Sequence, residues 1–227
     1  MRFVVTAGPT REHLDPVRFL SNPSSGRMGF AVARAAAAAG CKASLVAGPV
    51  SLATPEGVER VDVTSAREMM AAVESELEAA RGEMCVLVMS AAVADWRPKT
   101  SSPVKLKKGE MSAVLELERN PDILAAVNSK VKAGELDGSR LVRVGFAAET
   151  GDPEGEARRK CAAKGLDMIV ANDVSMPGCG FGVGTNKATL FFPDGGRADL
   201  EMMTKEELAG EIVARAIALA GRRSCDV

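Results

Sequence analysis

Serine, glycine, asparagine and arginine crowd one short stretch near the amino terminus, residues 21–29, which reads SNPSSGRMG. It opens an alanine-rich segment, 29–41, whose composition favours a helix. Helix starts present unpaired N–H groups and partial positive charge, and small residues let an anion approach the backbone closely. We therefore predict a substrate- or phosphate-binding turn made of Gly8, Ser24, Ser25, Gly26 and Arg27. A capped turn without a ligand explains the same residues equally well.

Two familiar glycine motifs are missing from this turn. It is neither the GxGxxG fingerprint of dinucleotide-binding folds nor the GxxxxGK[ST] pattern of P-loops. The turn alone therefore does not say which anion it would bind.

Two groups of lysines suggest further contacts to an anion. In VKLKK (104–108), a strand would place Lys105 and Lys107 on one face and Lys108 on the other. Such a basic ribbon would close over an anionic ligand, whereas an edge strand protected from aggregation by its lysines is the commoner alternative. Lys160 and Lys164 share one helix face and repel each other unless an anion lies between them. Cations at a surface helix end, near the negative pole of its dipole, are the simpler interpretation of that pair.

Two carboxylates follow apolar runs, where strands end. Asp95 and Asp173 stand where an acid can meet a base, a ribose or a metal ion, or can cap the next turn. The sequence NPDI (120–123) predicts a helix start with Asn120 as the N-cap and Pro121 in the first helical position.

Strand and helix patterns alternate along most of the chain. The predicted elements are strands at 2–8, 42–48, 58–63, 140–150 and 167–173 and at the start of 84–95, which then becomes a loop, helices at 29–41, 66–81, 120–131, 153–164 and 204–221, and a hairpin at 188–192 and 197–202. This order predicts an α/β fold, a Rossmann-like, mostly parallel sheet with helices on both faces and a β-hairpin addition. We expect a single domain, 1–227, from which a flap at about 96–118 projects.

Composition excludes several classes of protein. Hydrophobic residues make up 46% and charged residues 26%, which is typical of a globular chain, and the net charge of −1 predicts no nucleic-acid or membrane-surface partner. No apolar run is long enough to span a bilayer. Five cysteines without a CxxC pair, and a single histidine, His13, favour neither a zinc site nor a disulfide framework, so a cytoplasmic location is expected.

Several segments, taken together and in order, resemble phosphopantothenate–cysteine ligase (phosphopantothenoylcysteine synthetase) of the bacterial, CTP-using type. They are VTAGPTREHLDPVRFLSNPSSGRMGFAVA, AAVADWRP with KLKK, NPDI, VGFAAET, and KGLDMIVANDVS with GFG. The resemblance covers about residues 3–220. In many bacteria this enzyme is fused behind a flavin-dependent decarboxylase, and we expect neither that domain nor FMN on these 227 residues.

The resemblance implies a role for individual residues. Asn22 would contact an acyl-cytidylate, with its amide donating to the acyl oxygen, and Lys105 would be the catalytic lysine of the second half-reaction. The implied nucleotide contacts are Ser90, Ala91, Asp95, Lys105, Asn120, Pro121, Asp122, Ile123, Phe146, Lys160 and Lys164. The last two match triphosphate-binding lysines, which favours the ligand interpretation of that pair.

The implied reaction joins 4′-phosphopantothenate to L-cysteine through an acyl-cytidylate, with CTP cleaved to CMP and pyrophosphate. Mg²⁺ is expected to bridge the phosphates, with substrate oxygens and waters as most of its ligands; the protein ligands are unknown. The family works as a dimer whose lysine flap reaches a neighbouring site, and a separate decarboxylase is a possible partner.

The sequence departs from the family at two places. Residues 183–186 read VGTN where many members carry an acid, and Trp96 stands where tyrosine is frequent. Two other functions remain open: a Rossmann-like oxidoreductase that binds flavin or nicotinamide, which lacks its glycine fingerprint here, and a regulatory nucleotide-binding module, which would need neither Asn22 nor Lys105.

Overall fold

An eight-stranded sheet forms the centre of the computed structural model, which describes residues 1–107, 114–180 and 182–225. Its strands are, in spatial order, β13 (Arg197–Asp199), β12 (Thr189–Phe191), β10 (Met168–Asp173), β9 (Leu141–Glu149), β6 (Cys85–Met89), β1 (Arg2–Ala7), β4 (Lys42–Ala47) and β5 (Val58–Asp62). The six strands from β10 to β5 are parallel, and the β12–β13 hairpin adds antiparallel strands at one edge. The mostly parallel sheet and its hairpin addition are therefore confirmed.

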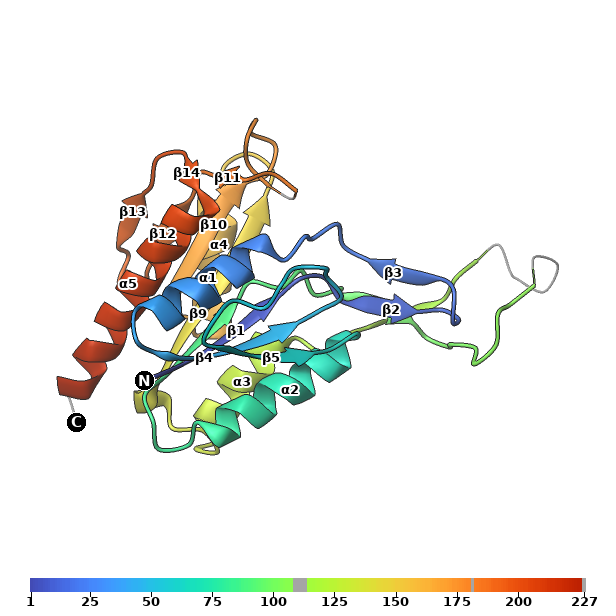
Figure 1. Cartoon of the computed structure of the whole chain (residues 1–227), viewed down its shortest axis with the longest axis horizontal. Coiled ribbons are helices and arrows are strands. Elements are labelled where there is room, and N and C mark those ends of the chain that lie inside the picture. The colour runs from blue at the N-terminus through green and yellow to red at the C-terminus, as the bar shows by residue number, and fades with distance from the viewer. Residues whose placement is uncertain (108–113, 181, 226–227) are drawn as a thin grey trace.

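Helices cover both faces of the sheet, as Figure 1 shows. One face carries α1 (Arg27–Ala38) and α5 (Lys205–Cys225); the other carries α2 (Ala66–Ala79), α3 (Ile123–Lys132) and α4 (Glu154–Lys164), and a short 3₁₀ turn spans Gly138–Arg140. Successive strand side chains point to opposite faces, so Phe3 and Val5 pack beneath α1 and α5 while Val4 packs on the other side. Both faces are apolar because both are buried, which explains the near-continuous hydrophobic runs of the strands.

The strand order places a crevice between β1 and β6. From β1 the chain builds outward through β4 and β5, and then from β6 in the opposite direction through β9 and β10. Ligands of such sheets bind outside the carboxyl ends of the strands at this switch point. The loops that follow β1 and β6 meet there, where the Ala92 amide donates to the Gly8 carbonyl at 2.9 Å.

Two small hairpins extend beyond the main sheet, to the right in Figure 1. One pairs β2 (Arg11–His13) with β3 (Phe19–Ser21), and the other pairs β7 (Trp96–Pro98) with β8 (Leu117–Arg119). A third ladder joins β11 (Thr185–Asn186) to β14 (Met203–Thr204). The first and third were not predicted, because strands of two or three residues carry no periodic pattern.

Among the described residues, the predicted flap forms a hairpin at its base, where β7 pairs with β8. Residues 101–107 form no strand, so the expectation that Lys105 and Lys107 share a strand face is wrong, and Lys108 lies outside the described residues. Instead of a ladder partner, this segment has contacts with the turn between β2 and β3. The Ser102 amide donates to the Leu14 carbonyl at 2.9 Å, and the Leu106 amide donates to the Asp15 carboxylate at 3.2 Å.

The NPDI segment starts its helix later than predicted. Asp122, not Asn120, is the N-cap of α3, and its Oδ1 accepts a hydrogen bond from the Ala125 amide at 3.0 Å. Asn120 is unavailable as a cap because its side-chain oxygen, the atom that would accept from the helix amides, instead accepts a hydrogen bond from the Arg97 guanidinium at 3.0 Å.

Candidate active site

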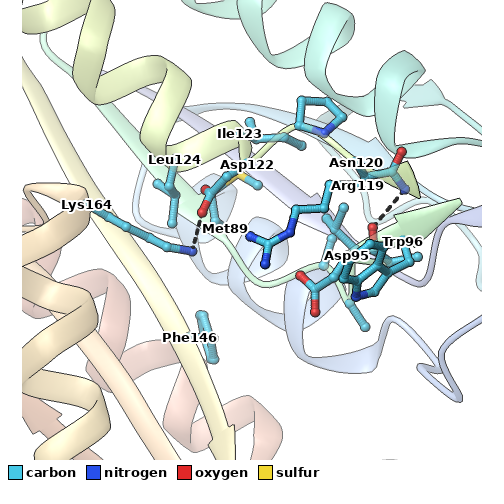
Figure 2. Close-up of a pocket in the computed structure, with 15 residues that line it drawn as sticks. Met89, Asp95, Trp96, Arg119, Asn120, Asp122, Ile123, Leu124, Phe146 and Lys164 are labelled. Carbon is cyan, nitrogen blue, oxygen red and sulfur yellow. Dashed lines mark hydrogen bonds and ion pairs between the residues drawn. The ribbon is translucent and has the colours of Figure 1, made fainter. Parts of the chain in front are cut away.

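A cavity of about 480 Å³ lies at the carboxyl end of β6 (Figure 2). The loop after β6, the start of α3, β9 and the end of α4 contribute to its wall. Eight of the eleven residues predicted to contact a nucleotide line it: Ala91, Asp95, Asn120, Pro121, Asp122, Ile123, Phe146 and Lys164. The structure thus brings together residues that the sequence separates by up to 73 positions, from 91 to 164.

Asn120 fixes the shape of this cavity. Its side-chain amide donates to Ala94, its backbone amide donates to the Asp95 carbonyl at 2.8 Å, and its Oδ1 accepts from the Arg97 guanidinium at 3.0 Å. These bonds tie the loop that carries Asp95 to the start of α3.

Asp122 and Lys164 form an ion pair at the same cavity, with Oδ2 and Nζ 3.0 Å apart (Figure 2). Lys160, one turn earlier on α4, instead pairs with Glu149 at 2.6 Å and with Glu156 at 3.5 Å, and it does not line the cavity. Protein carboxylates therefore relieve the repulsion between the two lysines. A phosphate that binds these ammonium groups has to displace a carboxylate or share the cation with it.

A smaller cavity of about 150 Å³ adjoins the larger one and shares Ala91, Ala92 and Phe146 with it. The predicted anion-binding residues Ser24, Ser25, Gly26 and Arg27 line it, and so does Ser90, whose hydroxyl donates to the Thr6 carbonyl at 2.6 Å. Gly8 lines neither cavity; it packs against Gly26 and accepts the Ala92 hydrogen bond described above.

The start of α1 is open toward the smaller cavity. Gly26 precedes the helix with φ of 78°, a conformation that favours glycine, and no described side chain caps the first-turn amides. At Gly29, a Cβ atom would come within 2.5 Å of the Ala7 Cβ and 2.6 Å of the Ser90 hydroxyl. The absent side chain lets the helix start pack directly on β1 and β6, with its N–H groups at the crevice.

Asn22 lies at the edge of both cavities without lining either. Its side-chain amide donates to the carbonyls of Ala92 and Val93, at 3.2 and 3.3 Å. Its N–H groups are therefore engaged by the loop after β6, and they would reach an acyl oxygen only after these bonds open. Lys105 lines neither cavity of its own chain.

In the part of the chain that the structure describes, no three His, Cys, Asp or Glu side chains gather in a way that could hold a metal ion. Within the same residues, none of the helices has the length and apolar character needed to cross a bilayer.

Residues 1–219 match the family of the DNA/pantothenate metabolism flavoprotein C-terminal domain. The chain belongs to this family. It is 46% identical over 225 residues to the coenzyme A biosynthesis bifunctional protein CoaBC of Bacillus subtilis, which covers 97% of this chain and 53% of the relative. It is 47% identical to the CoaBC protein of Vibrio cholerae, over 93% of this chain and 51% of that protein. The chain thus spans about half the length of the curated relatives it matches.

A solved structure resembles this chain over nearly its full length. The crystal structure of the C-terminal domain of a coenzyme A biosynthesis bifunctional protein CoaBC superposes with a TM-score of 0.78 and 38% identity, covering 97% of this chain and 98% of that one. The Rossmann-like fold is therefore shared with a relative of clearly related sequence.

Among the residues that line the two cavities, sequence reasoning missed four with charged or amide side chains. They are Arg119 in the larger cavity and Asn172, Asn186 and Lys205 in the smaller one. Arg119 directly precedes NPDI, so its place beside the motif was a usable signal in the sequence. In the structure its guanidinium lies 5.3 Å from the centre of the Trp96 ring. Lys205 begins a helix 59 or more residues from every predicted residue of its cavity, and no local pattern connects them.

Proposed function

We propose that this chain is a ligase that joins 4′-phosphopantothenate and L-cysteine in coenzyme A biosynthesis, with CTP as the activating nucleotide. Identity of 38% to the C-terminal domain of CoaBC over almost the whole chain supports the proposal. The observation that carries it is the adjacency of the two cavities, which meet at Ala91, Ala92 and Phe146. A nucleotide and an anionic acid can therefore lie side by side at the switch point of the sheet.

The chemistry begins with a poor acyl donor, because the leaving group of a carboxylate would be oxide. The substrate carboxylate attacks the α-phosphorus of CTP and expels pyrophosphate, which leaves a mixed anhydride. The amine of cysteine then attacks the acyl carbon, forms the amide and expels CMP. Most of the acceleration comes from holding two anionic reactants together and neutralising their charge.

The chain supplies cations and shape for these steps. In the larger cavity we assign the nucleotide to the walls formed by Phe146 and the NPDI segment, and its phosphates to Lys164 and Arg119. Lys160, one turn earlier on α4 and outside the lining, would join them after leaving Glu149. At the smaller cavity the α1 amides and Arg27 hold an anionic group of the substrates. Asn22 takes the acyl oxygen once its bonds to the loop after β6 have opened, and Lys105 acts on the second half-reaction.

Mg²⁺, when bound, would neutralise phosphate charge during attack on phosphorus. The described residues offer Asp95 as a carboxylate in the larger cavity but no cluster of three ligands, which suits an ion held mainly by phosphate oxygens and water.

We also propose that the chain works as a homodimer through its two projecting hairpins. Large apolar side chains are exposed there, including Val17 at 56%, Trp96 at 46% and Leu117 at 42%. A second copy would bury this surface and bring a neighbour's flap to the site, which accounts for the distance of Lys105 from its own cavities. A cytoplasmic location and a separate decarboxylase partner belong to the same proposal; Cys41, Cys85, Cys161 and Cys179 are free thiols.

One assay tests the proposed activity. Purified protein is incubated with CTP, Mg²⁺, 4′-phosphopantothenate and cysteine, and pyrophosphate and phosphopantothenoylcysteine are measured. We expect both products, and pyrophosphate without cysteine in no more than one equivalent per site. If neither product forms under any nucleotide and the purified protein carries a yellow flavin, the oxidoreductase alternative is favoured.

A further inference from the structure

The smaller cavity is positively charged. Its described lining contains the two cations Arg27 and Lys205 and no aspartate or glutamate. The amino terminus of α1 adds partial positive charge from amides that no described side chain caps. The larger cavity differs, because its cations Arg119 and Lys164 face Asp95 and Asp122 within the same lining. Positive charge without a carboxylate suits an anion supplied by a ligand.

Lys205 is the unusual member of this set. It is only 6% exposed, and among the described residues its ammonium group has one hydrogen bond, to the neutral Gly180 carbonyl at 3.1 Å. Burial lowers the pKa of Lys205 below its ordinary value, the nearby Arg27 lowers it further, and Glu206 acts in the opposite sense. A buried ammonium with a single neutral partner is costly to hold in the charged form. An anion in the cavity would supply the missing partner.

Asn186 gives independent evidence of a missing ligand. It is 6% exposed and lines the same cavity, and its Oδ1 is fully buried without a hydrogen-bond partner among the described residues. Buried side-chain amides are nearly always satisfied, so an orphaned one indicates a ligand or an ordered water. The amide offers two N–H donors to an anion, and its oxygen can accept from a hydroxyl or water bound with that anion.

We propose that Lys205 and Asn186 complete a phosphoryl-binding site in the smaller cavity, together with Arg27 and the first amides of α1. At about 150 Å³ this cavity has roughly a third of the volume of the larger one, about 480 Å³, which suits a phosphoryl group here and the bulk of the nucleotide in the larger cavity. The identity of the phosphoryl donor rests on the proposed function: it is either the triphosphate of CTP or the 4′-phosphate of phosphopantothenate. The competing explanation is that Lys205 only supports the described loop residues 177–180 through Gly180.

Direct titration with inorganic pyrophosphate tests the site without assuming the reaction. Isothermal calorimetry on the whole chain compares wild type with Lys205→Met, which keeps the apolar stem and removes the charge. The matched control is Lys187→Met, which removes an equal charge from an exposed position beside Asn186. We expect Lys205→Met to weaken pyrophosphate binding about ten- to one-hundred-fold, Lys205→Arg to restore part of it, and Lys187→Met to change it less than twofold.

A second variant protects the test from a folding defect. Asn186→Asp is nearly isosteric and places a negative charge in the cavity, so we expect it to abolish pyrophosphate binding while the melting temperature stays close to that of wild type. Unchanged pyrophosphate affinity in both Lys205→Met and Asn186→Asp would overturn the proposal and leave Lys205 with the loop-supporting role.

The source of the phosphoryl group is found by comparing ligands. Dissociation constants of Lys205→Met are measured for CTP with Mg²⁺, for 4′-phosphopantothenate and for pantothenate, which lacks the phosphate. Selective weakening of 4′-phosphopantothenate, with pantothenate unchanged, assigns the acid substrate; selective weakening of CTP assigns the nucleotide. If wild type makes no amide product, the proposed function fails. The pyrophosphate titration still tests whether Lys205 and Asn186 bind a phosphoryl group.

Discussion

The Asp15 carboxylate accepts a hydrogen bond from the Leu106 backbone amide, at 3.2 Å and 91 residues along the chain. The same buried carboxylate pairs with the Arg18 guanidinium, which in turn donates to the Leu106 carbonyl at 2.8 Å. The amides of Val17 and Arg18 complete the set around Asp15, at 2.9 and 2.8 Å. The turn between β2 and β3 therefore anchors the flap at the residue that follows Lys105.

Replacing Asp15 by asparagine should release this part of the flap. We expect Asp15→Asn to melt several degrees below wild type, and trypsin to cleave faster after Lys105 and Lys107. Amide formation should slow more than pyrophosphate release, because Lys105 loses its support. Asp199→Asn, at an exposed aspartate that pairs with Arg197, is the matched control and should leave all three readouts near wild type.

The same carboxylate predicts a pH dependence. The Arg18 guanidinium and three backbone amides hold the pKa of Asp15 well below its ordinary value. A lowered folded-state pKa contributes stability that is fully present above the ordinary carboxyl pKa of about 4 and is lost as the pH falls through the folded value. Melting temperatures between pH 7 and pH 3 should therefore fall less steeply below pH 4 for Asp15→Asn than for wild type. Parallel curves would show that Asp15 does not titrate as described.

Long apolar strands and alanine-rich helices could be predicted from the sequence because each carries its own periodic signal. The strand β1 and the helix α1 lie close to their expected ranges for that reason. The β2–β3 hairpin could not be predicted, since its strands have three residues each and depend on contacts with the flap. The start of α3 was placed too early because Asn120 and Asp122 are both good caps, and the tertiary bond from Arg97 to the Asn120 side-chain oxygen decides between them.

The candidate site likewise contains residues that could be predicted from the sequence and residues that could not. Residues in contiguous motifs, such as Asp122 in NPDI, could be found from sequence alone. Lys205 and Asn186 could not, because their significance lies in burial and in a missing partner, which are properties of the folded chain. The carboxylate partners of Lys160 and Lys164 could not be predicted either, since Glu149 and Asp122 come from other elements.

The lysines of α4 should determine the affinity for the nucleotide. Lys164→Ala removes the cation that lines the larger cavity and should raise the KM for CTP about tenfold, the effect of losing one charge-assisted contact. Adding Lys160→Ala should raise it further with little change in the KM for cysteine. Lys132→Ala, at a lysine near the end of α3 that lines neither cavity, is the control. An unchanged CTP requirement in the double variant would return both lysines to a structural role.

Asn22 should matter for the activated intermediate more than for folding. We expect Asn22→Ala to keep the melting temperature within a few degrees, because the lost bonds are two exposed contacts to Ala92 and Val93. Turnover of the intermediate should fall about a hundred- to a thousandfold, as when a single oxyanion donor is removed. Single-turnover quench experiments measure this step directly, and a rate like that of wild type would remove Asn22 from the chemistry.

Lys105 should act after activation, and in the site of the neighbouring subunit. Lys105→Gln is expected to slow amide formation about a hundredfold or more while pyrophosphate release without cysteine is largely retained. Equal slowing of the two half-reactions would make Lys105 a binding residue.

A mixing experiment tests whether the flap acts across the dimer. Two variants inactive on their own, Asn22→Ala and Lys105→Gln, are mixed after reversible dissociation. If the flap acts across the dimer, about a quarter of wild-type activity returns, because half of the dimers are mixed and each has one intact site. If every site uses its own flap, no activity returns.

The dimer itself should depend on the exposed apolar hairpins. Val17→Asp places a charge on a side chain that is 56% exposed, so the fold of the subunit should persist while self-association weakens. Sedimentation velocity should show a dimer for wild type and a monomer for this variant. A wild-type monomer at micromolar concentration, or a variant dimer as stable as wild type, would place the interface elsewhere.

Isotope transfer tests the central claim most directly. With ¹⁸O in both carboxylate oxygens of 4′-phosphopantothenate, attack on the α-phosphorus of CTP leaves one labelled oxygen bridging carbon and phosphorus, and the amine of cysteine expels it with CMP. Mass spectrometry should therefore find one ¹⁸O in each CMP and none in pyrophosphate. Unlabelled CMP, with ¹⁸O in inorganic phosphate or in no nucleotide product, would contradict an acyl-cytidylate formed at this site.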